Sequence, residues 1–562
     1  MKLKLIKPRV RKNINILDTY YYDIIKDETK YVVPPLSLAI IASLTPSDVE
    51  VSIVDENIEE IDFNEKVDLV GITVTSITAP RGYEIADMFR SKNVPVVIGG
   101  IHVRLMHKQS LEHADSVVIG EAENLWWRVI NDFKHNRLKR VYKNKKRPGL
   151  TDNPLPKWDL VKNTKYSVAT IMATRGCPHN CEFCVVRQHF GNNIRKRPVE
   201  DVVKEVAYLR KYYHRFWFVD YNMFFDKAYA KQLLNGLVPL GISYICFANM
   251  YIYKDNKLLE LMVKSGCKRV SIGFETIDPK GLKLLNKTGL NRIKEYAQVV
   301  KKIQGYGIQV KPQFIIGFEY DNTHVFDEIE TFVNENNILF PDIYIAGTFY
   351  GTSHFRRLKK EGNIDMNAYS SNKMGYVMLD FGSLGRDKAV FKTKELYSHL
   401  YSYDAIFNRM KKFYDEYKET IEQPFKHRSL KDVVKRHLFR AWATVLYLKK
   451  IRNFEILVFA LKLLWHPKSI YKNSPSSISY DLCDIERRRT FQHPYFFENY
   501  LIDKAHEEHS KNPLQNNFDN TTKINLKEDV ERFIEKKYRS YESLYGNAGA
   551  DSGKSRKLSC LR

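Results

Sequence analysis

Short apolar runs alternate with amphipathic stretches over roughly the first 135 residues. Runs rich in β-branched residues predict buried strands, and the stretches between them have helical spacing. The predicted strands are Leu3–Ile6, Glu50–Asp55, Leu69–Val74, Val94–Gly100 and Ser116–Gly120, and two predicted helices are Pro35–Leu44 and Tyr83–Arg90. This alternation is typical of a parallel sheet covered by helices on both faces. We therefore expect a Rossmann-like α/β domain over residues 1–137.

Polar residues and glycines follow several of these predicted strands. Parallel sheets of this type bind ligands beyond the carboxyl ends of their strands, at the point where the strand order reverses. The candidate rim residues are Thr73, Thr75, Ser76, Gly99, Gly100, His102, Gly120 and Glu121.

A second region of alternating strands and helices is predicted over residues 166–369. Its predicted strands are Ala169–Ala173, Phe216–Asp220, Tyr244–Ala248, Arg269–Phe274, Gln313–Gly317 and Ile343–Ala346, with helices such as Val199–Tyr212 and Tyr296–Gln304. This pattern favours a full or partial (β/α) barrel of the TIM type, with its chemistry at the carboxyl ends of the strands. The basic, proline-containing stretch 138–165 is predicted to connect the two domains.

Helical patterns dominate the rest of the chain, and we expect a mainly helical domain over 370–545 and a disordered tail over 546–562. The stretch 421–472 holds twelve Lys or Arg against three Asp or Glu, beside Leu, Phe and Trp residues. It is either a helical cap with a solvated face or an interfacial surface that contacts membranes and suits a lipid substrate. Nucleic acid is disfavoured, because no recognition module is present.

Net charge and hydropathy limit the expected partners and cellular location. The 562 residues carry a net charge of +24, which favours anionic partners. The basic N-terminus lacks the apolar core of a secretory signal, and no run approaches the ~18 apolar residues that span a bilayer. We expect a cytoplasmic protein, with peripheral membrane contact as the alternative.

Three of the seven cysteines crowd into one short segment, Arg175-Gly-Cys177-Pro-His-Asn-Cys181-Glu-Phe-Cys184, directly after a predicted strand. Closely spaced cysteine thiolates hold iron–sulfur clusters. Three protein ligands leave one iron of a four-iron cluster open, whereas a structural zinc site normally has four ligands. His179 could complete a zinc site, but no second Cys/His pair follows it at finger spacing.

This motif resembles that of the radical S-adenosylmethionine (SAM) superfamily. The resemblance implies that Cys177, Cys181 and Cys184 hold a [4Fe–4S] cluster whose open iron chelates SAM, with Phe183 against the adenine. The segment from Phe216 to Asn222 resembles the family's second-strand motif, with Tyr221 as the departure. By the same resemblance the remaining SAM-site residues are Asp220 and Asn222 on the methionine side, Glu275 on the ribose side and Gly317 along the adenine. No residue is singled out as the catalytic group.

The N-terminal region is similar to the cobalamin-binding type of domain that precedes many radical SAM barrels. The resemblance rests on Pro34-Pro35-Leu36-Ser37-Leu38, Asp68–Thr73, Gly99–His102 and Val118–Glu121, in that order. It implies that the rim residues contact cobalamin. The Asp-x-His-x-x-Gly motif that supplies an axial histidine to cobalt is absent, so His102 has either a packing role or a ligand contact.

Together these resemblances imply a radical SAM enzyme that functionalises an unactivated carbon. With cobalamin, the implied reaction is methylation of a lipid or natural-product-like small molecule, with a protein reductant such as ferredoxin or flavodoxin. One alternative is cobalamin-independent radical C–C coupling, cyclisation or rearrangement. The other, of a different class, is a non-catalytic cobalamin or redox sensor.

Overall fold

The computed structural model describes residues 1–9, 33–364 apart from positions 77, 145, 152 and 167, then 376–378, 384–422 and the single positions 458 and 461. Most of the helical domain expected over 370–545 lies outside these residues. Almost all of the basic stretch 421–472 and the whole tail 546–562 lie outside them as well.

The N-terminal region forms one six-stranded parallel sheet, as the alternating pattern predicts. The strand order is β2-β1-β3-β4-β5-β6. The strands are β1 (Lys2–Lys7), β2 (Glu50–Asp55), β3 (Leu69–Thr73), β4 (Val96–Gly99), β5 (Ser116–Ile119) and β6 (Val141–Lys143). The sequence did not predict β6, which adds an edge strand inside the stretch expected to connect the domains. Its buried Tyr142 donates a hydrogen bond to Asp132 at 2.9 Å, which ties the strand to the domain.

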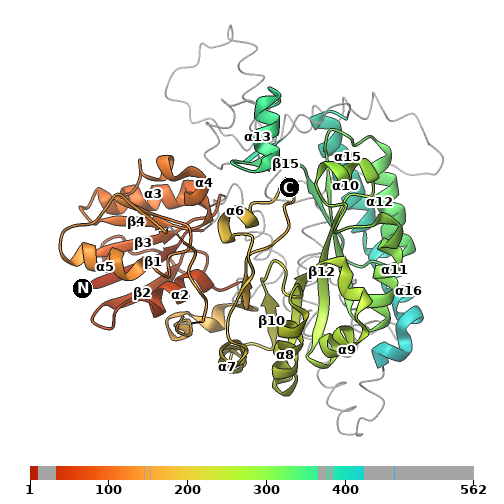
Figure 1. The fold of residues 1–562 in the computed structure, drawn as a ribbon, viewed down its shortest axis with the longest axis horizontal. Coiled ribbons are helices and arrows are strands. Elements are labelled where there is room, and N and C mark those ends of the chain that lie inside the picture. The colour runs from red at the N-terminus through yellow and green to blue at the C-terminus, as the bar shows by residue number, and fades with distance from the viewer. Residues whose placement is uncertain are drawn as a thin grey trace. The chain divides into compact units, whose positions relative to one another are not determined.

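Helices cover both faces of this sheet, in agreement with the expected Rossmann-like architecture (Figure 1). On one face, α2 (Leu36–Ser43) and α5 (Trp126–Lys134) bury Leu38 and Trp126 against β1, β3 and β5. On the other face, α3 (Ala79–Arg90) and α4 (Ile101–Ser110) bury Phe89 and Val103 against β3, β4 and β5. The helix α3 begins four residues before the predicted Tyr83, because Pro80 in its first turn starts a helix without losing a needed N–H.

The strand order also fixes where a ligand can bind. The chain places β2 on one side of β1 and β3 on the other, so the order reverses at β1. A crevice opens beyond the carboxyl ends of the strands at such a reversal. The loops that follow β3, β4 and β5 carry the predicted rim residues to this edge.

The second region forms a six-stranded parallel sheet that curves as an open half barrel, which confirms the expected partial TIM-type barrel. Its order is β14-β13-β12-β11-β10-β7. The strands are β7 (Ala169–Ile171), β10 (Arg215–Phe218), β11 (Ser243–Ala248), β12 (Cys267–Glu275), β13 (Gln309–Ile316) and β14 (Asp342–Ile345). Burial alternates residue by residue along β11 and β13, so one face of the sheet is fully covered and the other is only partly covered.

Helices between the strands cover the outer face of the half barrel (Figure 1). They are α7 (Val199–Leu209), α8 (Lys227–Leu237), α9 (Asn256–Lys264), α10 (Pro279–Leu284), α11 (Tyr296–Gly305) and α12 (His324–Glu335). Beyond β14 follow β15 (Gly347–Phe349), α13 (Ser353–Lys360), β16 (Tyr376–Met378), α15 (Arg386–Leu400) and α16 (Tyr403–Glu422).

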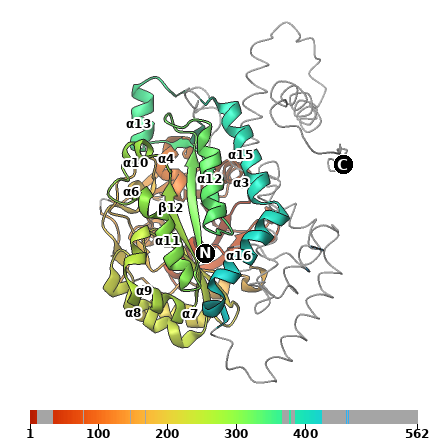
Figure 2. The same ribbon diagram turned by 90° about the vertical axis from the view of Figure 1, so that its right-hand side faces the viewer.

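The last two described helices protect the outer edge of the barrel. Figure 2 shows α15 and α16 running beside α12 and α11, and contacts between these pairs agree. Tyr397 of α15 donates a hydrogen bond to Ile343 O at 2.7 Å, and Tyr401 donates one to Pro341 O at 2.6 Å. These bonds cover the open edge of β14, which would otherwise present unpaired backbone groups. None of the described helices is both long enough and apolar enough to cross a bilayer.

Candidate functional site

The cysteine loop, residues 176–185, joins the short strand β8 (Thr174–Arg175) to the helix α6 (Val186–Phe190). Its first residue, Gly176, has φ of +105°, and a Cβ there would lie 2.1 Å from Asn193 O. The backbone of Cys177 donates to Gly191 O at 3.1 Å. Only glycine fits this close approach, which fixes the start of the loop against the chain that leads into β9 (Arg195–Lys196).

The three cysteines of this loop have free, half-buried thiols. The pKa of Cys181 is raised to about 11 and that of Cys184 to about 12, mainly by burial and in smaller part by neighbouring thiols of the trio. The Asn222 side chain lies close enough to lower the pKa of Cys177, so the residue predicted on the methionine side is near the loop. Three soft sulfur donors on one short loop are the ligand type that an iron–sulfur cluster takes. The residues present therefore fit the group that the motif implies.

Asp220 lies beside the loop but is fully buried. Its carboxylate accepts the backbone N–H groups of Thr174 at 2.5 Å and Ala173 at 3.2 Å, and the Thr174 hydroxyl at 2.7 Å. Burial raises its pKa to about 6 against these hydrogen bonds. In this structure Asp220 anchors the backbone that enters the cysteine loop.

The remaining residues of the predicted SAM site end neighbouring strands. Glu275 closes β12 with φ of +66°, where the register with β13 shifts. Gly317 follows β13 with φ of +104° and donates its N–H to Asp321 at 2.7 Å. Phe183 lies half-buried in the turn that Cys184 N closes onto Cys181 O at 3.2 Å. Because the strands are parallel, all of these groups lie at one edge of the half barrel.

The reversal point of the N-terminal sheet opens into a cavity of about 460 Å³. Its lining is mostly apolar side chains and glycine backbone. From the N-terminal domain it includes Thr73, Thr75, Gly99, Gly100, Gly120, Glu121 and Glu123. From the half barrel it includes Met172, Arg175, His189, Phe190, Val219 and Tyr221. The cavity thus adjoins the strand that leads into the cysteine loop.

One wall of this cavity is formed by glycine backbone, so no side chain projects from it into the cavity. A Cβ on Gly99 would meet no atom within 4 Å, so it would project into the open space of the cavity. A Cβ on Gly100 would lie 2.3 Å from Val74 O, and φ of +107° there also requires glycine. A wide, flat ligand can therefore lie directly on this backbone, which fits the corrin ring that the fold implies.

His102 does not line the cavity. Its side chain is fully buried, with Nε2 2.9 Å from the Tyr83 hydroxyl and Nδ1 3.3 Å from the Ser76 hydroxyl. Burial lowers its pKa to about 4. Of the two roles left open for His102, the structure has the packing role, and Ser76 is its partner.

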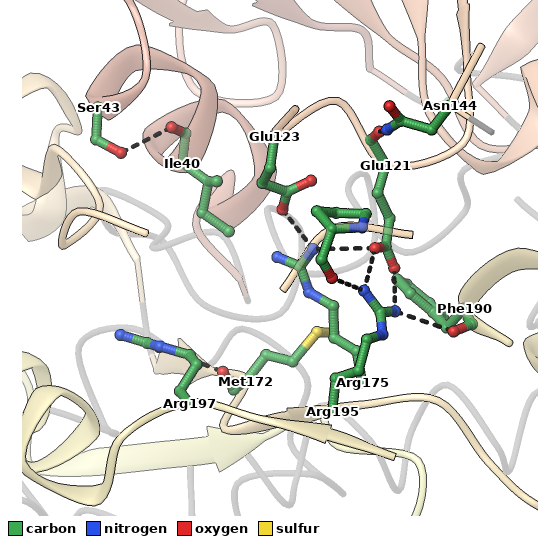
Figure 3. A network of polar contacts seen from close by, with 11 residues as sticks. Ile40, Ser43, Glu121, Glu123, Asn144, Met172, Arg175, Phe190, Arg195 and Arg197 are labelled. Carbon is green, nitrogen blue, oxygen red and sulfur yellow. Dashed lines mark hydrogen bonds and ion pairs between the residues drawn. The ribbon is translucent and has the colours of Figure 1, made fainter. Parts of the chain in front are cut away.

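Two glutamates and two arginines, here called the Glu–Arg network, join the rim to the cysteine loop (Figure 3). Arg195 of β9 binds both carboxylate oxygens of Glu121, at 2.5 and 2.6 Å. Arg175 of β8 pairs with Glu123 and lies 3.9 Å from Glu121. Burial disfavours the charge of Arg175, but Glu123 and Glu121 outweigh it and raise its pKa. Glu121, Glu123 and Arg175 are buried and Arg195 is half-buried. Arg175 lies two residues before Cys177.

The surroundings of this network are cationic. Burial, and then Arg104, Arg175, Arg147 and Arg195, lower the pKa of His189 to about 3. His189 is therefore neutral at ordinary pH. Of these four arginines only Arg175 lines the cavity, where it lies with Glu121 and Glu123.

Several residues of the site carry no signal in the sequence pattern. Asn249 donates to Asn222 at 3.3 Å, and Asp321 holds Gly317. Lys287 forms a buried ion pair with Glu275 at 2.5 Å. Glu123 and Arg195 complete the network. Of these residues, only Glu123 could have been found from the sequence, because it lies two residues after the predicted rim residue Glu121.

Comparisons with known proteins agree with this geometry. The Radical SAM superfamily model matches residues 171–333, and the B12 binding domain model matches residues 22–126. Bacteriochlorophyllide d C-12(1)-methyltransferase of Chlorobaculum tepidum is 31% identical over 67% of this chain and 84% of its own length. Hopanoid C-2 methylase of Rhodopseudomonas palustris is 25% identical over 73% of this chain and 78% of its own length.

Solved structures share the fold. The radical SAM methyltransferase TsrM of Kitasatospora setae, with cobalamin and a [4Fe–4S] cluster bound, has a TM-score of 0.53 at 16% identity over 65% of this chain and 78% of its own. The cobalamin-dependent radical enzyme OxsB, with aqua-cobalamin bound, has a TM-score of 0.58 at 14% identity over 95% and 84%.

The chain belongs to the cobalamin-dependent radical SAM methyltransferase family. The predicted enzyme class and the three predicted cofactors, the [4Fe–4S] cluster, SAM and cobalamin, are confirmed at the level of the family. Radical coupling and a non-catalytic sensor are not favoured, since the relatives named above are methyltransferases.

Replacing Cys181 with Ala should abolish cluster binding, because the loop then offers two thiolates in place of three. The measurement is iron and sulfide content after anaerobic reconstitution. The matched control is Cys246→Ala, which removes a buried thiol of β11 that faces Cys267 at 4.0 Å. Wild-type iron content in the Cys181 variant would contradict the assignment.

Replacing Glu121 and Glu123 together with Gln should loosen the chain around the cysteine loop. It leaves the buried Arg175 and the half-buried Arg195 without these counter-charges, and breaking a buried ion pair such as that of Arg175 costs about 3–5 kcal/mol. We expect faster amide hydrogen exchange in β8 and β9. Glu84→Gln, which breaks an exposed pair with Arg81 at 3.0 Å, is the control and should change little. Equal exchange in both variants would show that the network does not hold these strands.

Proposed function

We propose that this protein transfers a methyl group to an unactivated carbon of an apolar small molecule, such as a lipid or a lipid-like natural product. The observation that carries the proposal is the apolar cavity, which borders both the rim of the N-terminal sheet and the strand before the cysteine loop. The names of the relatives, which act on a bacteriochlorophyllide and on hopanoids, support the same substrate class.

In this proposal each cofactor has its own set of residues. The cluster is held by Cys177, Cys181 and Cys184. SAM lies against Phe183, Asn222, Glu275 and Gly317. Cobalamin lies against Thr73, Gly99, Gly100, Gly120 and Glu121. When bound, the cluster supplies an electron to SAM and cobalamin supplies a methyl carrier. Asp220 positions the cysteine loop. The glycine wall lets the carrier approach, and the Glu–Arg network holds the two halves of the site together.

Tyr221, the departure from the family motif, has a role in this proposal. It lines the cavity, is 40% exposed and lies 5.3 Å from the Phe190 ring. An aromatic side chain that is open to a cavity offers apolar contact area with one polar end. We assign it to substrate contact, between the cobalamin side and the cluster side of the site.

The test uses the full chain, reconstituted anaerobically with cluster and cobalamin, with dithionite and SAM that carries a deuterated methyl group. We expect transfer of the deuterated methyl to an apolar acceptor such as a hopene, seen by mass spectrometry, together with 5′-deoxyadenosine. Tyr221→Ala should lower product yield at least tenfold, about 1.4 kcal/mol or more, with iron and cobalt content unchanged.

The matched control is Tyr212→Ala, at an exposed tyrosine between α7 and β10, and it should react like the wild type. SAM cleavage without methylation of any apolar acceptor, with methylation of a polar acceptor such as tryptophan, would contradict the substrate class.

Two partners belong to this proposal. A protein reductant such as ferredoxin or flavodoxin supplies the electron, and the net charge of +24 favours an anionic partner. A lipid substrate also calls for peripheral membrane contact, for which the basic stretch 421–472 is the candidate surface.

Sedimentation with anionic vesicles should fall as salt rises, because exposed charges are screened over about 10 Å at 0.1 M salt. The same protein with neutral vesicles is the control. Equal binding to both, or none, would remove membrane contact from the proposal.

A further inference from the structure

A buried lysine that the sequence pattern does not mark faces the cysteine loop. Lys287 follows α10 on the outer rim of the half barrel and is 8% exposed. Its ammonium group pairs with Glu275 Oε1 at 2.5 Å and donates to Gly273 O at 3.2 Å. A charge is rarely buried without a partner, and here one partner is a predicted SAM-site carboxylate.

The turn that carries this lysine, residues 285–287, is bonded to the cysteine loop at two points. Glu182 N donates to Leu285 O at 3.2 Å, and Asn286 Nδ2 donates to Asn180 O at 2.9 Å. Glu182 and Asn180 flank Cys181 on both sides. The backbone of the turn is itself fixed, since Lys287 N donates to Leu282 O at 2.8 Å. The ammonium group is therefore held at a set place relative to the thiols.

Hydrogen bonds place the lysine and its partner beside the cysteine loop. The turn of Lys287 is bonded to the residues on both sides of Cys181. The ammonium group itself lies on Glu275 Oε1 and Gly273 O, at the carboxyl end of β12. A cation and a carboxylate are therefore both held next to the three cysteines.

This arrangement has a consequence for the electron that the cluster must accept. One-electron reduction adds a negative charge to a site that already holds three thiolates. A nearby cation in a poorly solvated site stabilises the more negative state, and net charge and hydrogen bonding are among the factors that set cluster potentials.

We propose that Lys287 raises the reduction potential of the [4Fe–4S] cluster, and that Glu275 limits this effect. The proposal rests on the assignment of the three cysteines as cluster ligands. It gives Lys287 a function in reduction of the cluster that is separate from contact with SAM or substrate.

The test is an EPR-monitored redox titration of the full-length, cluster-loaded protein in the absence of SAM. Lys287→Gln should lower the midpoint potential, and Glu275→Gln should raise it. The double variant should lie closer to the wild type than either single variant does, because both charges of the pair are gone. Lys287→Arg keeps the charge and should restore a potential near that of the wild type.

The matched control is Lys283→Gln, which removes an exposed lysine one turn earlier in the same chain segment and should leave the potential unchanged. Iron content is measured on every variant. Iron-free wild-type protein would refute the assignment of the cluster ligands, and with it the proposed function. If the cluster is loaded, the measured potential tests the role of Lys287 alone.

An unchanged potential in a fully loaded Lys287→Gln protein would overturn the proposal, including the case in which only SAM affinity falls. If Lys287→Gln does not fold or load, Glu275→Gln and Lys287→Arg carry the test. A potential in Glu275→Gln that is unchanged or lower, or one in Lys287→Arg that falls well below the wild type, would overturn the proposal equally.

Discussion

The ion pairs of Glu121 with Arg195 and of Glu123 with Arg175 are the contacts on which the link between the cavity rim and the cysteine loop depends. They tie the loop after β5 to the two short strands that flank the cysteine loop. Arg175 begins the cysteine motif, and Arg195 lies in the strand β9 that follows it. Chemistry that needs a methyl carrier and a cluster close to one substrate requires a defined distance between them. This network is one of the contacts that fix that distance.

The same arrangement explains the electrostatics of the site. Four arginines lie near His189, of which Arg175 is buried, and Lys287 adds a buried cation near the cysteine loop. Carboxylates are paired with cations or, like Asp220, held by backbone N–H groups. Cations therefore lie near the loop that carries the three cysteines. The cavity beside it is lined mostly by apolar side chains, with Glu121, Glu123 and Arg175 among its charged residues.

Much of this fold follows from sequence pattern alone. Continuous apolar runs such as Leu69–Val74 predict strands that are buried on both faces, and the structure has them within two residues. The cysteine motif and the glycines at 99 and 100 also stand out in the sequence, and at Gly100 the backbone admits no other residue. Ion pairs between residues that are far apart in the chain cannot be read from the sequence pattern. Arg195 and Lys287 are ordinary basic residues in the sequence, and only folding brings them to Glu121 and Glu275. His102 is the opposite case, a residue that the sequence pattern places at the rim. It follows a strand, but its ring turns into the core toward Tyr83.

The most direct test of the account is metal analysis of the chain purified anaerobically with cobalamin supplied. The account predicts about four irons, a matching amount of sulfide and about one cobalt per chain. It also predicts that the optical spectrum has both cluster and corrin bands. Four irons without cobalt would contradict the assignment of the cavity to cobalamin. Cobalt without iron would contradict the assignment of the cysteine loop.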